Sequence, residues 1–185
     1  MRTRMLLTLA VATLAAACSQ HAPPSAPDAR AAFNAADVQF VQQMLPHHAQ
    51  AIQLAGLVTG RTRRPELVRL AASITSSEAA ELQTMRGLLR RWQQPVPPAD
   101  PGRGGDSALG MASEGQVRWL ASLRGRPFDL GFATMMQAHH VGGIELAQAV
   151  VGQGRSSEVR MLAYQIQTSE QHELDELGRW HDAWV

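Results

Sequence analysis

The chain contains one pattern of residues twice, and this internal repeat constrains its fold more than any other feature. Residues 37–92 align without a gap with residues 129–184, and 20 of the 56 aligned positions are identical. Such repetition indicates that one supersecondary unit is used more than once. Both copies keep a His-His pair, a Met and two Glu beside ordinary apolar residues. The repeat therefore predicts two similar halves that carry the same unusual polar groups.

Apolar residues in both copies recur with the period of an amphipathic helix. Asp37 is expected to cap the first helix and Gly60 to stop it, while Pro65 is expected to open the second. Each predicted hairpin exposes an apolar face, so we expect the two to pack into one all-α four-helix bundle with approximate two-fold symmetry. The predicted helices span residues 37–58, 66–92, 128–151 and 158–184.

The amino terminus resembles an export signal. A basic start, Met1–Arg4, precedes an apolar run over residues 5–17 that is too short to span a bilayer but fits a secretory signal peptide. The small residues Ala15–Ala17 before Cys18 resemble a bacterial lipobox, which implies cleavage before Cys18 and attachment of a lipid to its sulfur. The alternative is an ordinary cleaved signal peptide with an incidental free cysteine.

These features predict the organisation of the whole chain. We expect an exported protein of the bacterial cell envelope, anchored on the periplasmic side to the membrane through its lipid. Cys18 is the only cysteine, so it has no disulfide partner within the chain, and the net charge of +1 gives no electrostatic case for nucleic acid. The predicted segments are a signal peptide (1–17), a flexible tether (18–33) and a helical domain (34–185), in which a linker (93–128) with a short helix (113–123) joins the repeats.

The polar groups of each repeat fall on the apolar faces of their helices. At 100° per residue, His47 and His48 straddle the centre of the first apolar stripe, and Met44 lies between them one turn earlier. Glu78 and Glu81 point to the core from the next helix. The equivalent residues of the second repeat are Met136, His139, His140, Glu170 and Glu173.

Carboxylates in an apolar interior must be paired or must coordinate a cation, so this set predicts a metal site. Imidazole suits copper, zinc and iron, thioether favours copper(I), and carboxylate favours harder ions such as manganese. The mixed set thus indicates a metal site without fixing the metal, and copper, iron, manganese and zinc all stay open at this point. Other histidines are weaker candidates: His172 is expected to be solvated, and His181 lies at a flank where it would join only a surface site. Met135 and Met161 are expected to fill the core.

The pattern Asp-x2-Phe-x3-Met-x2-His-His, followed by Pro-Glu and later by Ser-x3-Glu-Leu, resembles the bacterial domain-of-unknown-function family 305. The resemblance covers nearly all of residues 37–184. In the first half its residues are Asp37, Phe40, Met44, His47, His48, Pro65, Glu66, Ser77, Glu81 and Leu82. In the second half they are Asp129, Phe132, Met136, His139, His140, Glu158, Ser169, Glu173 and Leu174, with Ser157 in place of the proline.

The resemblance implies a ferritin-like helical bundle, often exported, with some members associated with copper binding or copper resistance. The chain departs from the family pattern at Glu78 and Glu170, where Gln is usual. It also lacks a Met-rich run, which argues against a high-capacity copper store.

Three functional hypotheses follow. The leading one is an envelope lipoprotein that binds copper for buffering, tolerance or delivery, with the four histidines as main ligands and the glutamates completing or orienting the sphere. The second is a ferritin-like oxidase with two iron or manganese ions. Such bundles use Glu-x-x-His motifs, and the Glu-x-x-Glu motifs here lack the histidine. The third is a metal-free interaction module in which His–Glu pairs rigidify the bundle. Because the di-iron motifs are incomplete, the sequence favours a metal-binding protein over an enzyme.

Overall fold

The structure is a computed structural model that describes residues 32–98 and 109–185. The predicted signal peptide, Cys18 and most of the predicted tether lie outside the described residues. The described part contains five helices and no strand. The helices are α1 (Ala35–Gly56), α2 (Pro65–Arg91), α3 (Glu114–Ser122), α4 (Gly125–Gln153) and α5 (Ser157–Trp184).

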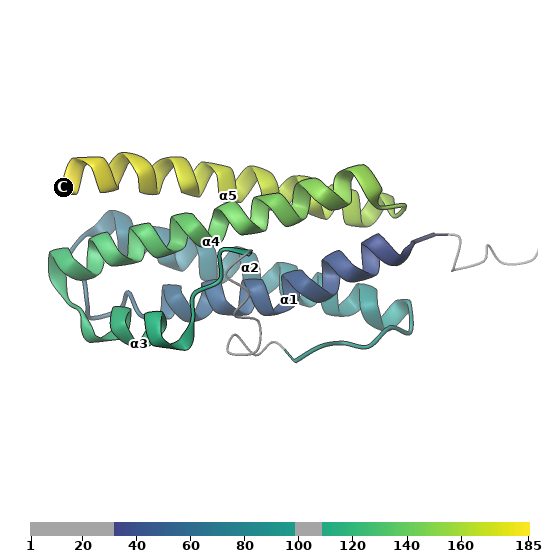
Figure 1. The fold of residues 1–185 in the computed structure, drawn as a ribbon, viewed down its shortest axis with the longest axis horizontal. Coiled ribbons are helices and arrows are strands. Elements are labelled where there is room, and N and C mark those ends of the chain that lie inside the picture. The colour runs from purple at the N-terminus through teal and green to yellow at the C-terminus, as the bar shows by residue number, and fades with distance from the viewer. Residues whose placement is uncertain (1–31, 99–108) are drawn as a thin grey trace, which may run out of the picture.

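The four long helices form one bundle from two antiparallel hairpins, which confirms the predicted fold class (Figure 1). One hairpin is α1 with α2, and the other is α4 with α5. The hairpins meet chiefly through α1 and α4, while the short α3 packs against α4. None of the helices in the described ranges is both long and apolar enough to cross a membrane.

The start of α1 differs from the prediction in its capping residue. Asn34 is the N-cap, and its side chain accepts a hydrogen bond from the Asp37 amide, while the Asp37 carboxylate accepts one from the Asn34 amide. Asp37 is thus the third residue of a capping box and not the cap itself. The helix also ends at Gly56, before Gly60, which adopts a φ of 74° in the following turn. Pro65 opens α2 as predicted.

Each repeat's aspartate holds the turn of the opposite hairpin. Asp37 Oδ2 accepts hydrogen bonds of 3.0 Å from the amides of Arg155 and Ser156, between α4 and α5. Asp129 Oδ2 accepts one of 3.1 Å from Nε of Arg64, at the start of α2. The two buried aspartates therefore join the hairpins in an approximately symmetric way.

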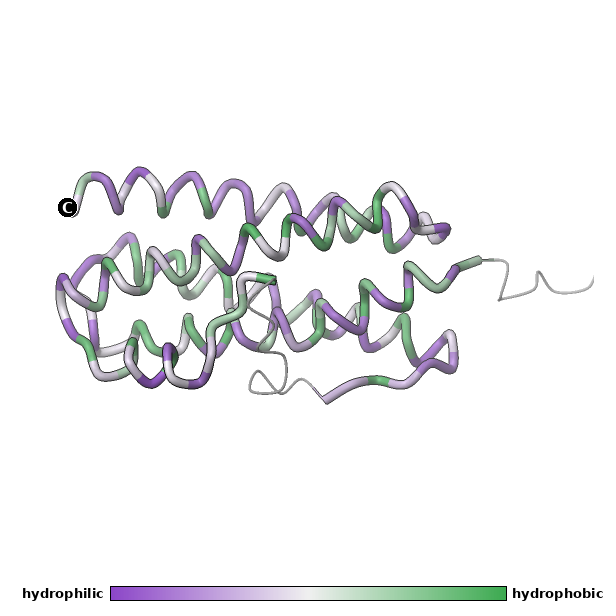
Figure 2. Tube along the Cα trace, in the orientation of Figure 1, coloured by the Kyte–Doolittle hydropathy of each residue, from purple (hydrophilic) through white to green (hydrophobic). Residues whose placement is uncertain are grey.

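The apolar core is divided into two clusters, one at each end of the bundle. The first joins the end of α1 and the start of α2 to the start of α4 and the end of α5. The second joins the other halves of the same four helices. Between the clusters, each long helix contributes polar residues to a middle layer. Along each of these helices, hydrophilic and hydrophobic residues are interspersed, as expected for amphipathic helices (Figure 2).

Candidate metal centre

The middle layer of the bundle gathers the predicted histidines and glutamates from all four long helices. His47 and His48 on α1 and His139 and His140 on α4 have no solvent exposure. We call these four histidines, together with Glu78 and Glu81 on α2 and Glu170 and Glu173 on α5, the polar layer. Glu78 and Glu170 are also buried, at 4% and 2% exposure. The helical period of the sequence thus correctly predicted that these side chains face the interior of the bundle.

At the edge of the polar layer, one histidine of each repeat lies against a glutamate of the same hairpin. His48 Nε2 is 2.6 Å from Glu81 Oε2, within hydrogen-bond distance. The equivalent contact, from His140 Nε2 to Glu173 Oε2, is 2.9 Å long but lacks hydrogen-bond alignment. Glu81 and Glu173 are the more exposed glutamates, with side chains 17% and 10% accessible. They connect the buried histidines to the surface.

The inner groups of the polar layer lack hydrogen-bond partners within the described part of the chain. Both carboxylate oxygens of Glu78 and of Glu170 are unpaired, as are both ring nitrogens of His139 and Nδ1 of His47 and of His48. Buried polar atoms in native proteins nearly always have a partner, and an unpaired one costs about 1–3 kcal/mol. This concentration of unpaired donors and acceptors is the strongest indication that the layer holds a ligand.

Burial shifts the protonation of these groups toward their neutral forms. Removal from water, reinforced by the charge of His48, lowers the pKa of His47 to about 3. Burial and the neighbouring His47 likewise lower the pKa of His139 well below its usual value. Burial raises the pKa of Glu78 and of Glu170 well above the usual value, with further contributions from neighbouring carboxylates. His47 and His139 are therefore held unprotonated, which is the form that binds metals.

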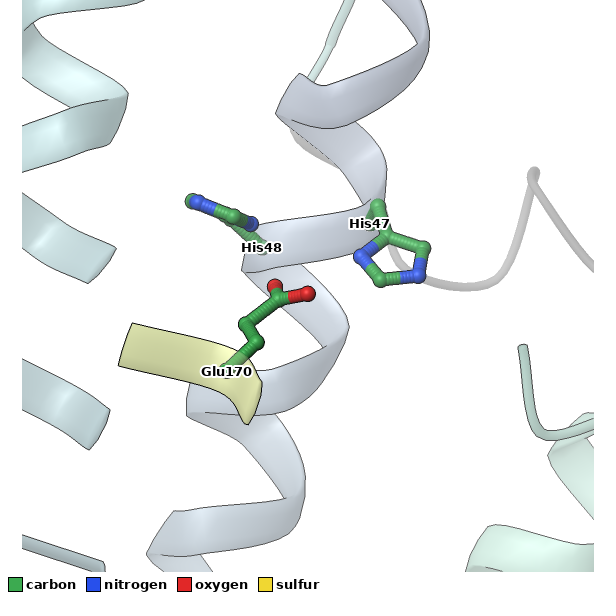
Figure 3. Close-up of side chains that lie close together, drawn as sticks. All are labelled: His47, His48 and Glu170. Carbon is green, nitrogen blue, oxygen red and sulfur yellow. The ribbon is translucent and has the colours of Figure 1, made fainter. Parts of the chain in front are cut away.

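Two groups of three residues in the polar layer have ligand atoms within 4.8 Å of one another. The first consists of His47, His48 and Glu170, and the second of Glu78, His140 and Glu170. Donors bound about 2.0–2.2 Å from one ion lie at most about 4.4 Å apart, close to this spacing. In the first group, the Glu170 carboxylate reaches from α5 toward the two imidazoles of α1 (Figure 3). Nitrogen and oxygen donors of this kind suit a borderline transition-metal ion.

A segment of the linker closes one side of the polar layer. His47 Nε2 is 3.2 Å from the Leu109 carbonyl oxygen, and the buried Gln50 side chain bonds both the amide and the carbonyl of Ala112. The backbone of Leu109 lies where a side chain at Gly142 would stand. No expectation from the sequence included Leu109–Ala112. The signal for this contact is the pair of glycines, Gly110 and Gly142, where two backbones approach each other closely.

On the opposite side of the hairpins, a surface pocket of about 350 Å³ reaches the polar layer through Glu173. The pocket lies between α2 and α5 and is also lined by Glu66, His172 and Glu176. His172 is exposed, as predicted. Its lining also includes Arg69, and Glu173 connects it to His140, whose Nε2 lies 2.9 Å from the carboxylate.

Other predicted residues have different surroundings. Met44 and Met136 are fully buried, but Met44 packs in one apolar cluster and Met136 in the other, so the thioethers lie on opposite sides of the polar layer. His139 lies in the layer but belongs to neither group of three. Met161 is 61% exposed, so the expectation that it fills the core was wrong, whereas Met135 packs partly buried against the core.

Comparison with known proteins places the chain among helical proteins of one family. The family described as domain of unknown function, DUF305, matches residues 37–184. A curated relative, uncharacterized protein L153 of Acanthamoeba polyphaga mimivirus, is 34% identical over 53 residues, which are 29% of this chain. That match spans about a third (35%) of the length of the relative.

Solved structures match over most of their length. A DUF305 fragment from Deinococcus radiodurans has 30% identity and a TM-score of 0.73, over 81% of this chain and 97% of that chain. A DUF305 protein from Streptomyces coelicolor has 28% identity and a TM-score of 0.72, over 80% and 93% of the two chains. CopM in its Cu(II)-bound form has 26% identity and a TM-score of 0.71, over 80% and 97%. CopM has also been solved with Cu(I) and with silver.

Proposed function

The chain belongs to the DUF305 family, and we propose that it binds a transition metal, copper foremost, in the polar layer of its bundle. The observation that carries this proposal is the set of buried imidazole nitrogens and carboxylate oxygens that lack partners within the described residues. A cation would satisfy these atoms together, because imidazole and carboxylate are both good ligands for such ions. The resemblance to CopM, which binds copper and silver, supports copper as the metal.

In this proposal the four histidines supply the main ligands, and the glutamates have two roles. Glu78 and Glu170 complete the coordination sphere, since they belong to the two groups of closely spaced donors. Glu81 and Glu173 orient His48 and His140 from outside, as carboxylates next to metal-binding histidines commonly do. Met44 and Met136 lie next to the layer and would favour the reduced ion.

We further propose that the protein works in the bacterial envelope, held to the membrane by a lipid on Cys18. This part of the proposal is supported by the basic start, the apolar run and the small residues that precede Cys18. A lipid-anchored protein with a buried copper site would buffer or deliver the ion, or confer tolerance to it.

The two alternative functions have less support. A standard di-iron oxidase site needs Glu-x-x-His motifs, whereas α2 and α5 carry Glu-x-x-Glu. A metal-free module accounts for the contacts of His48 with Glu81 and of His140 with Glu173. It also accounts for the longer contact of 3.8 Å between His48 Nδ1 and Glu78 Oε2. It leaves unexplained the buried atoms of Glu170 and His139, which lack hydrogen-bond partners among the described residues.

The experiment is a copper titration of the purified protein and of a His47→Leu, His139→Leu double variant. Leucine fills the space of the imidazole without a ligand atom, and circular dichroism shows whether the variant is folded. We expect the wild type to bind copper and the folded double variant to lose at least tenfold in affinity. A His172→Leu variant, changed at an exposed histidine, is the control and should bind as the wild type does. Equal affinity in the folded double variant would refute the proposal.

A further inference from the structure

The two groups of closely spaced donors in the polar layer have one residue in common. Glu170 stands with His47 and His48 in the first group and with Glu78 and His140 in the second. It comes from α5, and its partners in the two groups come from α1, α2 and α4. Glu170 therefore has a ligand atom within 4.8 Å of donors from both hairpins, whereas its repeat equivalent, Glu78, belongs to only one group.

A difference between the two repeats explains the central position of the Glu170 carboxylate. A Cβ placed on Gly143 of α4 would overlap this carboxylate, with Oε1 at 2.7 Å and Cδ at 2.8 Å. The equivalent position in the first repeat is Ala51, which is fully buried and already has a Cβ. The bare backbone at Gly143 thus gives Glu170 room that Glu78 does not have at the equivalent position.

We propose that the polar layer holds two metal ions bridged by the carboxylate of Glu170, and that Gly143 is the positioning residue that admits this bridge. One ion would be bound by His47 and His48, with His139 beside His47, and the other by Glu78 and His140, with one oxygen of Glu170 on each. This inference rests on the proposed metal-binding function and specifies the form of its site.

The number of donors favours two ions over one. The polar layer contains four histidines and four glutamates, and both carboxylate oxygens of Glu78 and of Glu170 are buried without a hydrogen-bond partner among the described residues. A single four-coordinate ion would leave several of the buried donors without a partner, at a cost of about 1–3 kcal/mol for each. Two ions that share Glu170 use the donors of both groups.

The test is a Cu(II) titration of the purified protein followed by electron paramagnetic resonance. Two Cu(II) ions joined by one carboxylate interact magnetically, so we expect about two tightly bound ions per chain and a resonance weaker than the copper content requires. Measuring the interaction separates paired ions in the layer from isolated ions on surface histidines such as His172.

Two variants and a matched control complete the design. Gly143→Ala should displace the Glu170 carboxylate, reduce tight binding to about one ion and restore the full resonance of isolated Cu(II). Ala51→Gly, the equivalent exchange in the first repeat, should keep the paired signal. If Gly143→Ala does not fold, Glu170→Gln removes the charged bridge with little change in shape and should lose the paired signal in the same way.

The outcomes distinguish this inference from the function on which it rests. One tightly bound ion in the wild type, or a paired signal that persists in folded Gly143→Ala or Glu170→Gln protein, would overturn the bridged pair and leave copper binding intact. No tight binding in the wild type would overturn both proposals.

Discussion

The imidazole rings of His47 and His139 lie against each other in a tilted arrangement, with centroids 3.8 Å apart and planes inclined by 34°. The two residues are equivalents in the repeat, one on α1 and the other on α4. A residue that contacts its own equivalent must lie near the axis that relates the two halves. This pair therefore marks the approximate two-fold axis of the bundle, and the polar layer is built around it.

Replacement of His139 by leucine should stabilise the metal-free protein. Both ring nitrogens of His139 are buried and lack partners among the described residues, so an apolar side chain of similar size removes a penalty of about 1–3 kcal/mol. Urea unfolding of chelator-treated protein measures the change, and the exposed His172→Leu should alter stability by less than about 0.5 kcal/mol. A clear loss of stability in His139→Leu would show that those nitrogens have partners in solution.

Acid should destabilise the metal-free protein through His47. The unfolded chain takes up a proton on this residue near pH 6.5, and the folded chain only near pH 3. The stability that this residue contributes is therefore complete above pH 6.5 and is lost as the pH falls toward 3. Urea unfolding of the wild type and of His47→Leu between pH 7 and pH 4 measures this effect. The free energy of unfolding should decline less steeply with falling pH in the variant than in the wild type. An equal decline in both proteins would contradict the lowered pKa of His47.

Glu170 should have the opposite dependence on pH. Its pKa is raised by burial in the folded protein, so above its usual value of 4.5 the unfolded state releases a proton that the folded state retains. Its contribution to stability thus falls as the pH rises from 4.5 toward the folded pKa. Metal-free Glu170→Gln should become more stable than the wild type as the pH increases from about 5 to 8. If the variant is more stable than the wild type by the same free energy of unfolding at every pH, the raised pKa of Glu170 is not the cause.

Gly142→Ala should destabilise the fold by displacing the linker from the polar layer. A Cβ at this position would overlap the backbone of Leu109, which is not a flexible side-chain end, and such overpacking costs about 1–3 kcal/mol. Gly152→Ala on the same helix is the matched control, because a Cβ there meets nothing within 4 Å. Alanine should stabilise that position slightly, by up to about 1 kcal/mol, since it favours helix more than glycine does. Thermal unfolding of the two variants measures the difference, and equal melting temperatures would show that the linker moves aside freely.

The fold and the inward direction of the site residues could be predicted from the sequence because both depend on periodicity. The repeat and the helical period placed the histidines and glutamates on buried faces, and the structure brings them into one layer. Capping was less predictable, because Asn34 and Asp37 are both good acceptors and only the backbone path decides which is the cap.

Contacts between distant segments escaped the sequence analysis. Neither the approach of Leu109 to His47 nor the attachment of each Asp to the opposite turn has a local pattern. Met161 was misplaced because a lone methionine on a helix does not reveal which neighbours cover it, and here it faces solvent. The special place of Glu170 was also hidden, since it depends on the absence of a side chain at Gly143 on another helix.

The most direct test of the metal site is a crystal structure of the copper-loaded protein with anomalous scattering measured at the copper absorption edge. We expect strong copper peaks inside the bundle, between Glu170 and the imidazoles of His47, His48 and His140. Copper peaks found only on the surface, with the polar layer empty of metal in a fully loaded crystal, would contradict this expectation.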